Sequence, residues 1–578
     1  MPKSANYSFS SRRGKSCPFL FYYHRFHFPF VARTKYALPM TPTSPLELPF
    51  PPLVSGPEMR GLESRAFAAG IAEETLMLEA GAGLARVVVD WLPVPGVAVV
   101  FAGKGHNAGD AFVLAEHLLN AGWHVEIRLA WPESELRPLA ARQLAVVRDR
   151  VTFCPLDAAD VPRGGPLLLL DGLLGIGGGG LLQGPAAEGV RQINALRQRE
   201  HALTLAVDLP SGLGGDPAPV AADLTVTLGW PKDLLFSDDA AAAVGRLVTV
   251  PLTDLPAPER MPGDPIGRDV LVTAAGLREW LLPRPSFARH KGQSGRIGIL
   301  AGSGGLTGAA RLAATAAAMM GGGLVTLFCP RKVYDILAAA CPPEVMVQAV
   351  GSCQEVRDFP WDALGAGPGL GAAPLPLLAD LILHDPRPLV VDADALNALA
   401  AGPWLGRAHR TSRGSPPGNG KPPFAGPRLL TPHPGELARL GLATDAGLSA
   451  RPRRAQAQVL AEITGATLLA KSARSFVIEK NCPAAWNGTG HPLMARGGMG
   501  DVLTGFLTVF AAQGMPLYHA AALGSWLLGR GGELYHESTG WEEPGLASEV
   551  MRCAAGGAMA ELRAGWQRDI RRHGARIA

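Results

Sequence analysis

The sequence predicts an α/β protein built from two doubly wound, three-layer domains in series. Short apolar segments with the length and composition of buried strands alternate with amphipathic helical segments along most of the chain. The proline-rich stretch at 253–267 interrupts this alternation, which then resumes. Because 578 residues exceed one ordinary hydrophobic core, each half is expected to form its own parallel sheet covered by helices on both faces.

In the first half, strands are expected where apolar runs lie between turn residues. The expected strands are 96–103, 124–130, 166–173, 203–210 and 223–229. Residues 109–121 separate the first two strands and carry apolar residues at helical spacing. Because the strands are apolar at nearly every position, both faces of this sheet should be buried, as is usual for parallel sheets.

The second half repeats this pattern. The expected strands are 295–302, 323–330, 388–396, 428–436, 467–473 and 475–480. The stretch 406–427 has few apolar residues and many Gly, Pro and Arg, which is typical of a disordered surface insertion. We therefore divide the chain into a leader at 1–50, a first domain at 51–252, a linker at 253–270, a second domain at 271–565 that contains the insertion, and a tail at 566–578.

The first 40 residues differ in composition from the rest of the chain. They contain several Lys and Arg residues and no acidic residue, as a transit peptide does. However, the stretch "FLFYYHRFHFPF" lacks the apolar core and the small-residue cleavage pattern of a signal peptide. We expect this leader to be a disordered tail, or to lie upstream of a translation start at Met40.

The composition argues against several classes of protein. The net charge of +4 is small for this length and Lys and Arg are scattered, which argues against nucleic-acid binding. No uncharged apolar run reaches the roughly 18 residues of a membrane span. The seven cysteines form no CxxC pair and show no metal-binding spacing, so reduced thiols and a cytoplasmic location are expected.

One glycine-rich stretch of the second domain, "RGGMGDVLTG" at 496–505, is chemically specific. Gly497, Gly498 and Gly500 can form an anion-binding nest at a helix start, and Asp501 then lies in the first helical turn. This aspartate is either a helix cap or a base beside bound phosphates. Such a base would take a proton from a substrate hydroxyl as that hydroxyl attacks a phosphoryl group.

Five motifs make the second domain resemble the ribokinase-like dehydratase domain of the NAD(P)H-hydrate repair enzymes. In chain order they are "HKGQSGRIGILAGS" with "LTGAA", "GPGLG", "DADALN", "TPHPGE" and "GHPLMARGGMGDVLTG", and they span about 280–560. Members of this family use ADP or ATP, with Mg²⁺, to dehydrate (6S)-NAD(P)HX. The resemblance implies Asp501 as the catalytic base and places four residues at the hydrate: Ala309, Gly371, His433 and Asp501. Without the motif, His433 would more often be structural, and "DADALN" is equally typical of an ordinary strand-end turn.

The sequence departs from the family pattern at the nucleotide motif. The family usually has Lys-Gly-Ala-x-Thr, whereas this chain has "KSARS". The implied nucleotide-binding residues are Lys471, Ser472, Ala473, Arg474, Ser475, Gly498 and Gly500. Ser475 can replace the threonine hydroxyl, but Ser472 in place of glycine could crowd the backbone. His491 stands where the family has Asn before Pro, and both departures bear on nucleotide affinity more than on the reaction.

In the first domain, three oxygen-bearing side chains follow neighbouring expected strands. They are Asn107 in "GKGHNAGD", Asp171 in "LDGLLGIG" and Ser211 in "VDLPSG". Such a trio suits an alkali or alkaline-earth cation rather than zinc, and the alternative is three unrelated turn residues. Residues 175–180 match GxGxxG, but no acid follows at the spacing of a dinucleotide-binding fingerprint.

These stretches, together with "LMLEAGAGLA" at 76–85, resemble the NAD(P)H-hydrate epimerase domain over roughly 55–250. The resemblance implies a K⁺ site at Asn107, Asp171 and Ser211. It also implies that Asp208 and Lys232 do the acid–base work. The implied hydrate-binding residues are His106, Asn107, Ala108, Gly109, Asp110, Gly175, Ile176, Gly177, Gly178, Gly179, Gly180, Leu181 and Asp208. Because Ala108 and Ala111 replace glycines that are common in the family, this loop is expected to be tighter than usual.

Together, the two resemblances imply a Rossmann-like N-terminal domain and a ribokinase-like C-terminal domain in one bifunctional enzyme. The first would interconvert (R)- and (S)-NAD(P)HX, and the second would convert (S)-NAD(P)HX to NAD(P)H while ADP gives AMP and phosphate. A composition rich in Ala, Gly, Arg and Leu favours the ADP-dependent bacterial type over the ATP-dependent one. The expected partners are NADHX, NADPHX, ADP and further copies of the chain in a homo-oligomer, with no nucleic acid or membrane. The alternative is a small-molecule kinase of the ribokinase superfamily fused to a non-catalytic domain that binds a phosphate-bearing ligand.

Overall fold

The computed structural model describes residues 48–177, 181–259, 267–283, 286–372, 376–402, 423–444, 451–540 and 544–564. Several predicted features lie wholly or mostly outside these ranges. They are Gly178, Gly179 and Gly180, the leader, the insertion at 406–427 and the tail.

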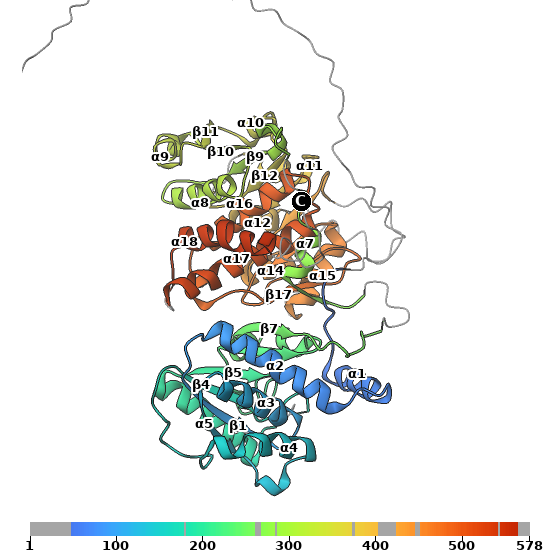
Figure 1. Cartoon of the computed structure of the whole chain (residues 1–578). Helices are drawn as coiled ribbons and strands as arrows, with labels where there is room; N and C mark the ends of the chain where they lie inside the picture. Colours follow the sequence, from blue (N-terminus) through green and yellow to red (C-terminus); the bar gives the residue numbers. More distant parts are fainter. Residues whose placement is uncertain are drawn as a thin grey trace, which may run out of the picture. The chain divides into compact units, whose positions relative to one another are not determined.

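The first half of the chain forms one sheet (Figure 1). Its strands are β1 (Val97–Ala102), β2 (His124–Leu129), β3 (Thr152–Phe153), β4 (Leu167–Gly172), β5 (Leu203–Val207), β6 (Leu224–Leu228) and β7 (Arg246–Val250). All neighbours are parallel, in the order β3-β2-β1-β4-β5-β6-β7. The five predicted strands are confirmed. The two edge strands were not predicted, because β3 is short and exposed and β7 is only half-buried.

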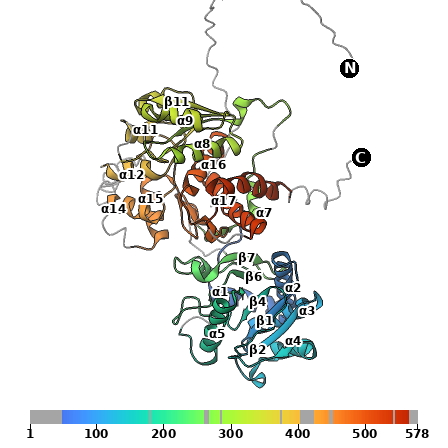
Figure 2. The same cartoon turned by 90° about the vertical axis from the view of Figure 1, so that its left-hand side faces the viewer.

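Helices cover both faces of this sheet. They are α1 (Gly56–Ala68), α2 (Glu73–Trp91), α3 (His106–Asn120), α4 (Pro138–Val147), α5 (Gly184–Glu200) and α6 (Ala241–Val244). Ala98 and Val100 of β1 pack with α2, α3 and α4, whereas Val97 and Val99 pack with α5 on the opposite face. Figure 2 shows α5 on one side of the strands and α2, α3 and α4 on the other. The predicted doubly wound arrangement is confirmed for this half.

The second half forms another sheet. Its strands are β8 (Val270–Val272), β9 (Arg296–Leu300), β10 (Leu324–Pro330), β11 (Val345–Val350), β12 (Ala363–Ala366), β13 (Leu389–Val391), β14 (Arg428–Leu430), β15 (Thr467–Ala470), β16 (Phe476–Ile478) and β17 (Ala485–Asn487). Their order is β11-β10-β9-β12-β13-β14-β15-β16-β17-β8, and only β16 runs antiparallel to its neighbours among the described strands. The predicted strands 388–396 and 428–436 were too long, because β13 and β14 lead almost directly into helices.

The helices of the second half also lie on both faces of their sheet. They are α7 (Ala274–Glu279), α8 (Thr307–Met319), α9 (Tyr334–Ala340), α10 (Cys353–Arg357), α11 (Leu378–His384), α12 (Ala393–Ala401), α14 (Pro434–Thr444), α15 (Arg453–Thr464), α16 (Met499–Ala512), α17 (Leu517–Thr539) and α18 (Ala547–Arg552). Helices α8, α16 and α17 cover one face, and α11, α12, α14 and α15 cover the other (Figure 2). None of the helices described is both long and apolar enough to cross a membrane.

Each sheet has a point at which the strand order reverses. In the first sheet this switch point lies between β1 and β4, and in the second it lies between β9 and β12. The crossovers on the two sides of a switch point leave on opposite faces, so the loops after these strands diverge and open a crevice for ligands. The predicted substrate-binding segments 106–110 and 175–177 flank the first crevice. Ala309 and Gly371 flank the second.

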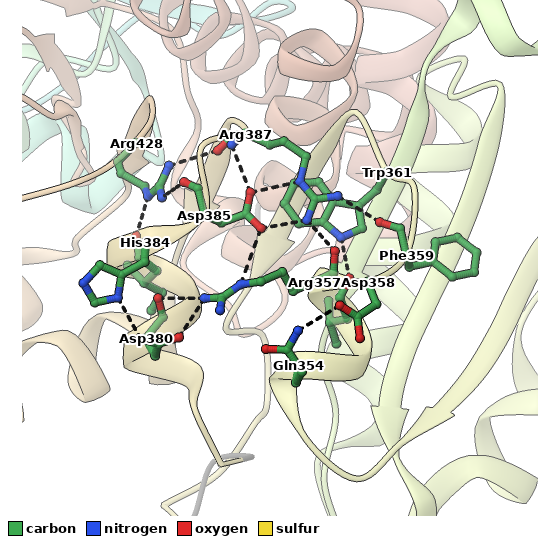
Figure 3. A network of polar contacts seen from close by, with 12 residues as sticks. Gln354, Arg357, Asp358, Phe359, Trp361, Asp380, His384, Asp385, Arg387 and Arg428 are labelled. Carbon is green, nitrogen blue, oxygen red and sulfur yellow. Dashed lines mark hydrogen bonds and ion pairs between the residues drawn. The ribbon is translucent and has the colours of Figure 1, made fainter. Parts of the chain in front are cut away.

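A network of polar contacts lies at the amino ends of β13 and β14, at the end of the second sheet away from the crevice (Figure 3). The carboxylate of Asp385, which is fully buried, accepts hydrogen bonds from Arg387 Nε (2.9 Å) and Nη2 (2.7 Å). The guanidinium of Arg387 stacks 3.4 Å from the centroid of the Trp361 ring. Arg428 donates to the carbonyl oxygens of Ile382 (2.6 Å) and Arg387 (2.9 Å). Burial alone would raise the pKa of Asp385, but the hydrogen bonds and charge of Arg387 outweigh it and the pKa lies below its usual value.

Candidate active sites

The second sheet gathers polar side chains at the carboxyl ends of three neighbouring strands. Asp392 follows β13, Thr431 follows β14 and Lys471 follows β15. Asp392 Oδ1 accepts hydrogen bonds from Lys471 Nζ (2.5 Å) and Thr431 Oγ1 (2.8 Å), and its Oδ2 accepts one from Thr504 Oγ1 (3.0 Å). Asp392 is 2% exposed, so it is the buried hub of this site. The sequence left "DADALN" undecided between turn and function. It did not assign the two threonines, which lie in the motifs "TPHPGE" and "RGGMGDVLTG", to Asp392; only the fold brings them there.

Asp501 lies beside this hub. Gly498 caps α16 with φ of 100°, a backbone conformation that favours glycine. A Cβ on Gly500 would lie 3.3 Å from Asp392 Oδ2 and 3.4 Å from Lys471 Nζ, so the first turn of α16 touches the Asp392–Lys471 pair. Burial and the negative charge of Asp392 raise the pKa of Asp501 to about 6. Within the described chain Asp501 makes no side-chain hydrogen bond, so the capping alternative for this aspartate is not supported.

The predicted hydrate-binding residues of the second domain lie around the β9–β12 switch point and the end of β14. A Cβ on Gly369 would lie 3.0 Å from Ala309 Cβ, so the loop that carries Gly371 packs against the start of α8. The backbone N–H of Gly371 donates to Asp394 Oδ2 (2.7 Å), a contact that the sequence did not predict. His433 accepts a hydrogen bond from Gly435 N at Nδ1 (3.0 Å), and its side chain is 51% exposed. Its ring is therefore oriented and accessible.

Residues 471–475 form a tight turn closed by its own hydroxyl groups. Ser475 Oγ donates to Ser472 O (2.9 Å) and accepts from Ser472 N (3.1 Å), while Ser472 Oγ donates to Arg474 O (2.8 Å). Arg474 is 5% exposed, and its guanidinium donates to Gly488 O (3.3 Å). The turn therefore directs Lys471 to Asp392 and the arginine into the protein interior. The roles of these residues at a nucleotide remain a prediction.

In the first sheet, Asp171, Ser211 and Asn107 lie around the β1–β4 switch point. Asp171 accepts hydrogen bonds from Ser211 N (2.7 Å) and Ser211 Oγ (2.6 Å). A Cβ on Gly175 would lie 3.3 Å from Asn107 Oδ1, and the buried Nδ2 of Asn107 has no partner among the described residues. Asp171 is fully buried with no Lys, Arg or His in ion-pair distance among these residues, and burial raises its pKa to about 6. A buried carboxylate without a counter-ion fits a cation that prefers oxygen ligands, whereas the unpartnered N–H group of Asn107 calls for a hydrogen-bond acceptor.

The predicted acid–base residues of the first domain form a buried ion pair. Asp208 follows β5 with φ of 66°, which is rare for a residue other than glycine and is typical of functional sites. Its Oδ1 accepts hydrogen bonds from Lys232 Nζ (2.5 Å) and Leu228 N (3.1 Å). Lys232 is 1% exposed and also donates to Leu228 O (2.6 Å). Asp110, in the first turn of α3, has a pKa well above its ordinary value because of burial and the negative charge of Asp208.

The remaining predicted hydrate-binding residues differ in exposure. His106 is exposed and lies 3.7 Å from Glu73, measured between Nε2 and Oε2. Ala108 is fully buried, and a Cβ on Gly109 would lie 2.4 Å from Met77 Cε, so this turn packs closely against α2. The tighter loop expected from the two alanine replacements stays a prediction. Leu181 is 65% exposed.

Both halves of the chain match known proteins. A family model described as NAD(P)H-hydrate dehydratase matches residues 297–552, and one described as YjeF-related protein N-terminus matches residues 73–234. A bifunctional NAD(P)H-hydrate repair enzyme Nnr from Moorella thermoacetica is 36% identical over 75% of this chain and 82% of its own length. The Nnr of Gloeobacter violaceus is 33% identical over 83% of this chain and 94% of its own length. Among solved structures, an ADP/ATP-dependent NAD(P)H-hydrate dehydratase from Bacillus subtilis is 26% identical, covers 52% of this chain and 98% of its own, and has a TM-score of 0.41.

Proposed function

The chain belongs to the family of bifunctional NAD(P)H-hydrate repair enzymes, and from this premise we propose how its two sites divide the reaction. The first domain is an NAD(P)H-hydrate epimerase and the second an NAD(P)H-hydrate dehydratase. Because hydrates occur as R and S epimers, a dehydratase that accepts only the S form leaves the R form unrepaired. An epimerase on the same chain supplies the S form from the R form.

For the second domain, we propose that Asp501 is the base of a phosphoryl transfer from ADP to the ring hydroxyl of the hydrate. Asp501 takes the hydroxyl proton while the oxygen–phosphorus bond forms and AMP leaves. Loss of phosphate and of a ring proton then restores the double bond of NAD(P)H. The observation that supports this role is the position of Asp501 beside the Asp392–Lys471 pair with no hydrogen bond of its own. A pKa of about 6 keeps this carboxylate ionised at neutral pH and still basic enough to accept a proton.

Lys471 and the start of α16 are the proposed phosphate-binding groups. The ammonium of Lys471 contacts Asp392 and is 20% exposed, so it can also reach a bound anion. The N–H groups at the start of α16 point toward the same place and add their partial positive charge. No group of three or more His, Cys, Asp or Glu side chains in the described ranges could hold a metal alone, so Mg²⁺ would bind together with the nucleotide phosphates.

For the first domain, we propose that Asp208 and Lys232 do the acid–base work, with K⁺ held by Asn107, Asp171 and Ser211. A bound K⁺ would supply the positive charge that the buried Asp171 lacks. Ser211 and Asn107 would complete the site with oxygen atoms and fix the loop after β4. A homo-oligomer and a cytoplasmic location stay predictions.

The recovery of reduced-nicotinamide absorbance from purified hydrates tests this function. The enzyme is given (S)- or (R)-NADPHX with K⁺ and Mg²⁺, and ADP and ATP are supplied separately. We expect recovery from the S form with ADP, and from the R form at a rate that depends on the first domain. Asp501→Asn should slow dehydration by about 10²–10⁴-fold. Asp335→Asn, a change to an exposed aspartate in the first turn of α9, should have no effect.

Two outcomes would contradict the proposal. Full activity in Asp501→Asn would remove this residue from the chemistry. A phosphorylated product that accumulates without free phosphate or absorbance would favour the small-molecule kinase instead.

A further inference from the structure

Helix α1 forms one wall of the epimerase site. Val54, just before the helix, forms a parallel β-bridge with Lys232, with hydrogen bonds from Val54 N to Pro231 O and from Asp233 N to Val54 O, both 3.0 Å. Ser55 and Glu58 then make a capping box that fixes the start of the helix. The helix therefore starts from a fixed point next to the proposed catalytic lysine.

One face of α1 is turned toward the loop after β4. Gly56 lies close to Ile176, because a Cβ on this glycine would be 3.5 Å from Ile176 O. One turn later, Arg60 Nη1 donates a hydrogen bond to the same oxygen (3.1 Å). Glu63 follows Arg60 by three positions and so lies on the same face of the helix. The opposite face packs into the core through Met59, Leu62 and Ala66.

Glu63 lies within electrostatic range of the charged groups of the site. The groups that act on its charge are Asp208, Lys232, Arg60 and Glu73, and it acts in turn on Asp110. Glu63 is partly buried and makes no hydrogen bond or ion pair with the residues that the structure describes. Burial and the negative charge of Asp208 raise its pKa.

The site thus holds two carboxyl groups with different partners. Asp208 accepts hydrogen bonds from Lys232 Nζ (2.5 Å) and from the backbone N–H of Leu228 (3.1 Å). Glu63 has no such partner and holds its proton more readily. Two neighbouring carboxyl groups whose environments separate their proton affinities provide a base and an acid at the same pH.

An independent feature shows that a ligand belongs at this place. On the other side of the loop that Arg60 holds, the amide of Asn107 is nine-tenths buried beside Gly175, and its Nδ2 has no partner in the described chain. A buried N–H group without a partner is unfavourable unless a ligand or ordered water satisfies it. Arg60, one turn before Glu63 on α1, and Asn107 on α3 therefore border the same loop.

We propose that Glu63 is a second acid–base residue of the epimerase and acts together with Asp208. This inference rests on the proposed function of the first domain. In the hydrate, the ring carbon that carries the hydroxyl group is also bonded to the ring nitrogen, so the ring can open without an oxidant or reductant. Asp208 takes the hydroxyl proton, the carbon–oxygen double bond forms, and the electron pair of the carbon–nitrogen bond moves to nitrogen, which takes a proton from Glu63.

The reverse steps give the other epimer. Rotation about the bond to the aldehyde carbon presents its opposite face to nitrogen. The nitrogen electron pair adds to this carbon, Glu63 takes its proton back, and Asp208 returns a proton to oxygen. Both carboxyl groups are then in their starting states, so the same two residues can catalyse the reaction in both directions.

The test is the rate of interconversion of (R)- and (S)-NADHX by the full-length enzyme across pH, followed by NMR. We expect the wild-type rate to fall at high pH, where Glu63 loses its proton. Glu63→Gln should lower the rate by about 10²-fold or more and should remove that alkaline decline. Glu63→Asp should keep part of the rate and keep the decline. Glu116→Gln alters a glutamate on α3 without a hydrogen bond or ion pair in the described residues and should match the wild type.

Each contrary result has a separate meaning. Dehydration of the S epimer by the same preparation measures how much enzyme is folded, so loss of protein is not mistaken for loss of chemistry. A Glu63→Gln enzyme with the wild-type rate, or with a lower rate but the same alkaline decline, would overturn the role of Glu63. Failure of the wild type itself to interconvert the epimers would overturn the proposed function of the domain instead.

Discussion

Two aspartates at the two ends of β13 have opposite environments. Asp385 precedes the strand and Asp392 follows it, and both side chains are almost completely buried. Asp385 is bound by the guanidinium of Arg387, and Arg428 beside it is saturated by backbone carbonyl groups (Figure 3). Asp392 is bound by one lysine and two hydroxyl groups. The cations of the first network are paired with acceptors within the protein, whereas the second has one cation for two carboxylates.

This difference separates a network whose charges are paired from one that is short of cations. At the Asp385 end every charge has a partner within the protein, and the pKa of the aspartate is lowered. At the Asp392 end, the single ammonium of Lys471 faces the carboxylates of Asp392 and Asp501, and the pKa of Asp501 is raised to about 6. The Asp392 end can therefore be stabilised by a ligand that brings cations or accepts hydrogen bonds. The polar groups at the Asp385 end are already paired within the protein.

The largest effect is expected from Lys471→Met, which removes the only cation bound to Asp392 in the described structure. Dehydration should fall by about 10²-fold or more, because the nucleotide phosphates lose a fixed positive charge. The free energy of unfolding should fall by less than the roughly 3–5 kcal/mol of a fully buried pair, because Asp392 keeps two hydroxyl donors. Steady-state kinetics and thermal unfolding measure the two effects. Lys480→Met, at an exposed lysine, is the control, and equal activity in both variants would contradict a catalytic role for Lys471.

The opposite result is expected from Asp385→Asn. Removal of this carboxylate leaves Arg387 and Arg428 without their counter-charge, so stability should fall by about 3–5 kcal/mol while the folded enzyme keeps its activity. Asp380→Asn breaks an exposed pair with Arg357 in the same network and should change stability by no more than about 1 kcal/mol. Thermal unfolding and the turnover of the folded fraction separate these effects. A variant that is stable but inactive would show that the Asp385 network belongs to the reaction.

The sequence predicted those parts of the fold and sites that depend on neighbouring residues. Apolar runs located eleven strands, and the family motifs singled out Asp501, Asp208 and Lys232, of which the fold brings Lys232 to Asp208. The sequence could not assign Thr431 or Thr504 to Asp392, because these contacts span 39 and 112 positions. Glu63 was missed for a similar reason: its helix lies far from Asp208 along the chain, and one glutamate on an amphipathic helix is indistinguishable from a solvated one.

The smallest effect, a shift in pH dependence, tests how Asp392 and Asp501 are coupled. For the free enzyme, kcat/KM for dehydration should be low below pH 6 and rise to a plateau above it, because a base must be ionised and the pKa of Asp501 is about 6. Asp392→Asn removes a negative charge that raises this pKa and leaves Lys471 free to lower it. The midpoint should then move to lower pH by up to about one unit, with a lower plateau. A midpoint that stays in place would mean that burial alone sets the basicity of Asp501, and a midpoint that rises would mean that Asp392 holds Lys471 near the base and that Lys471 moves away in the variant.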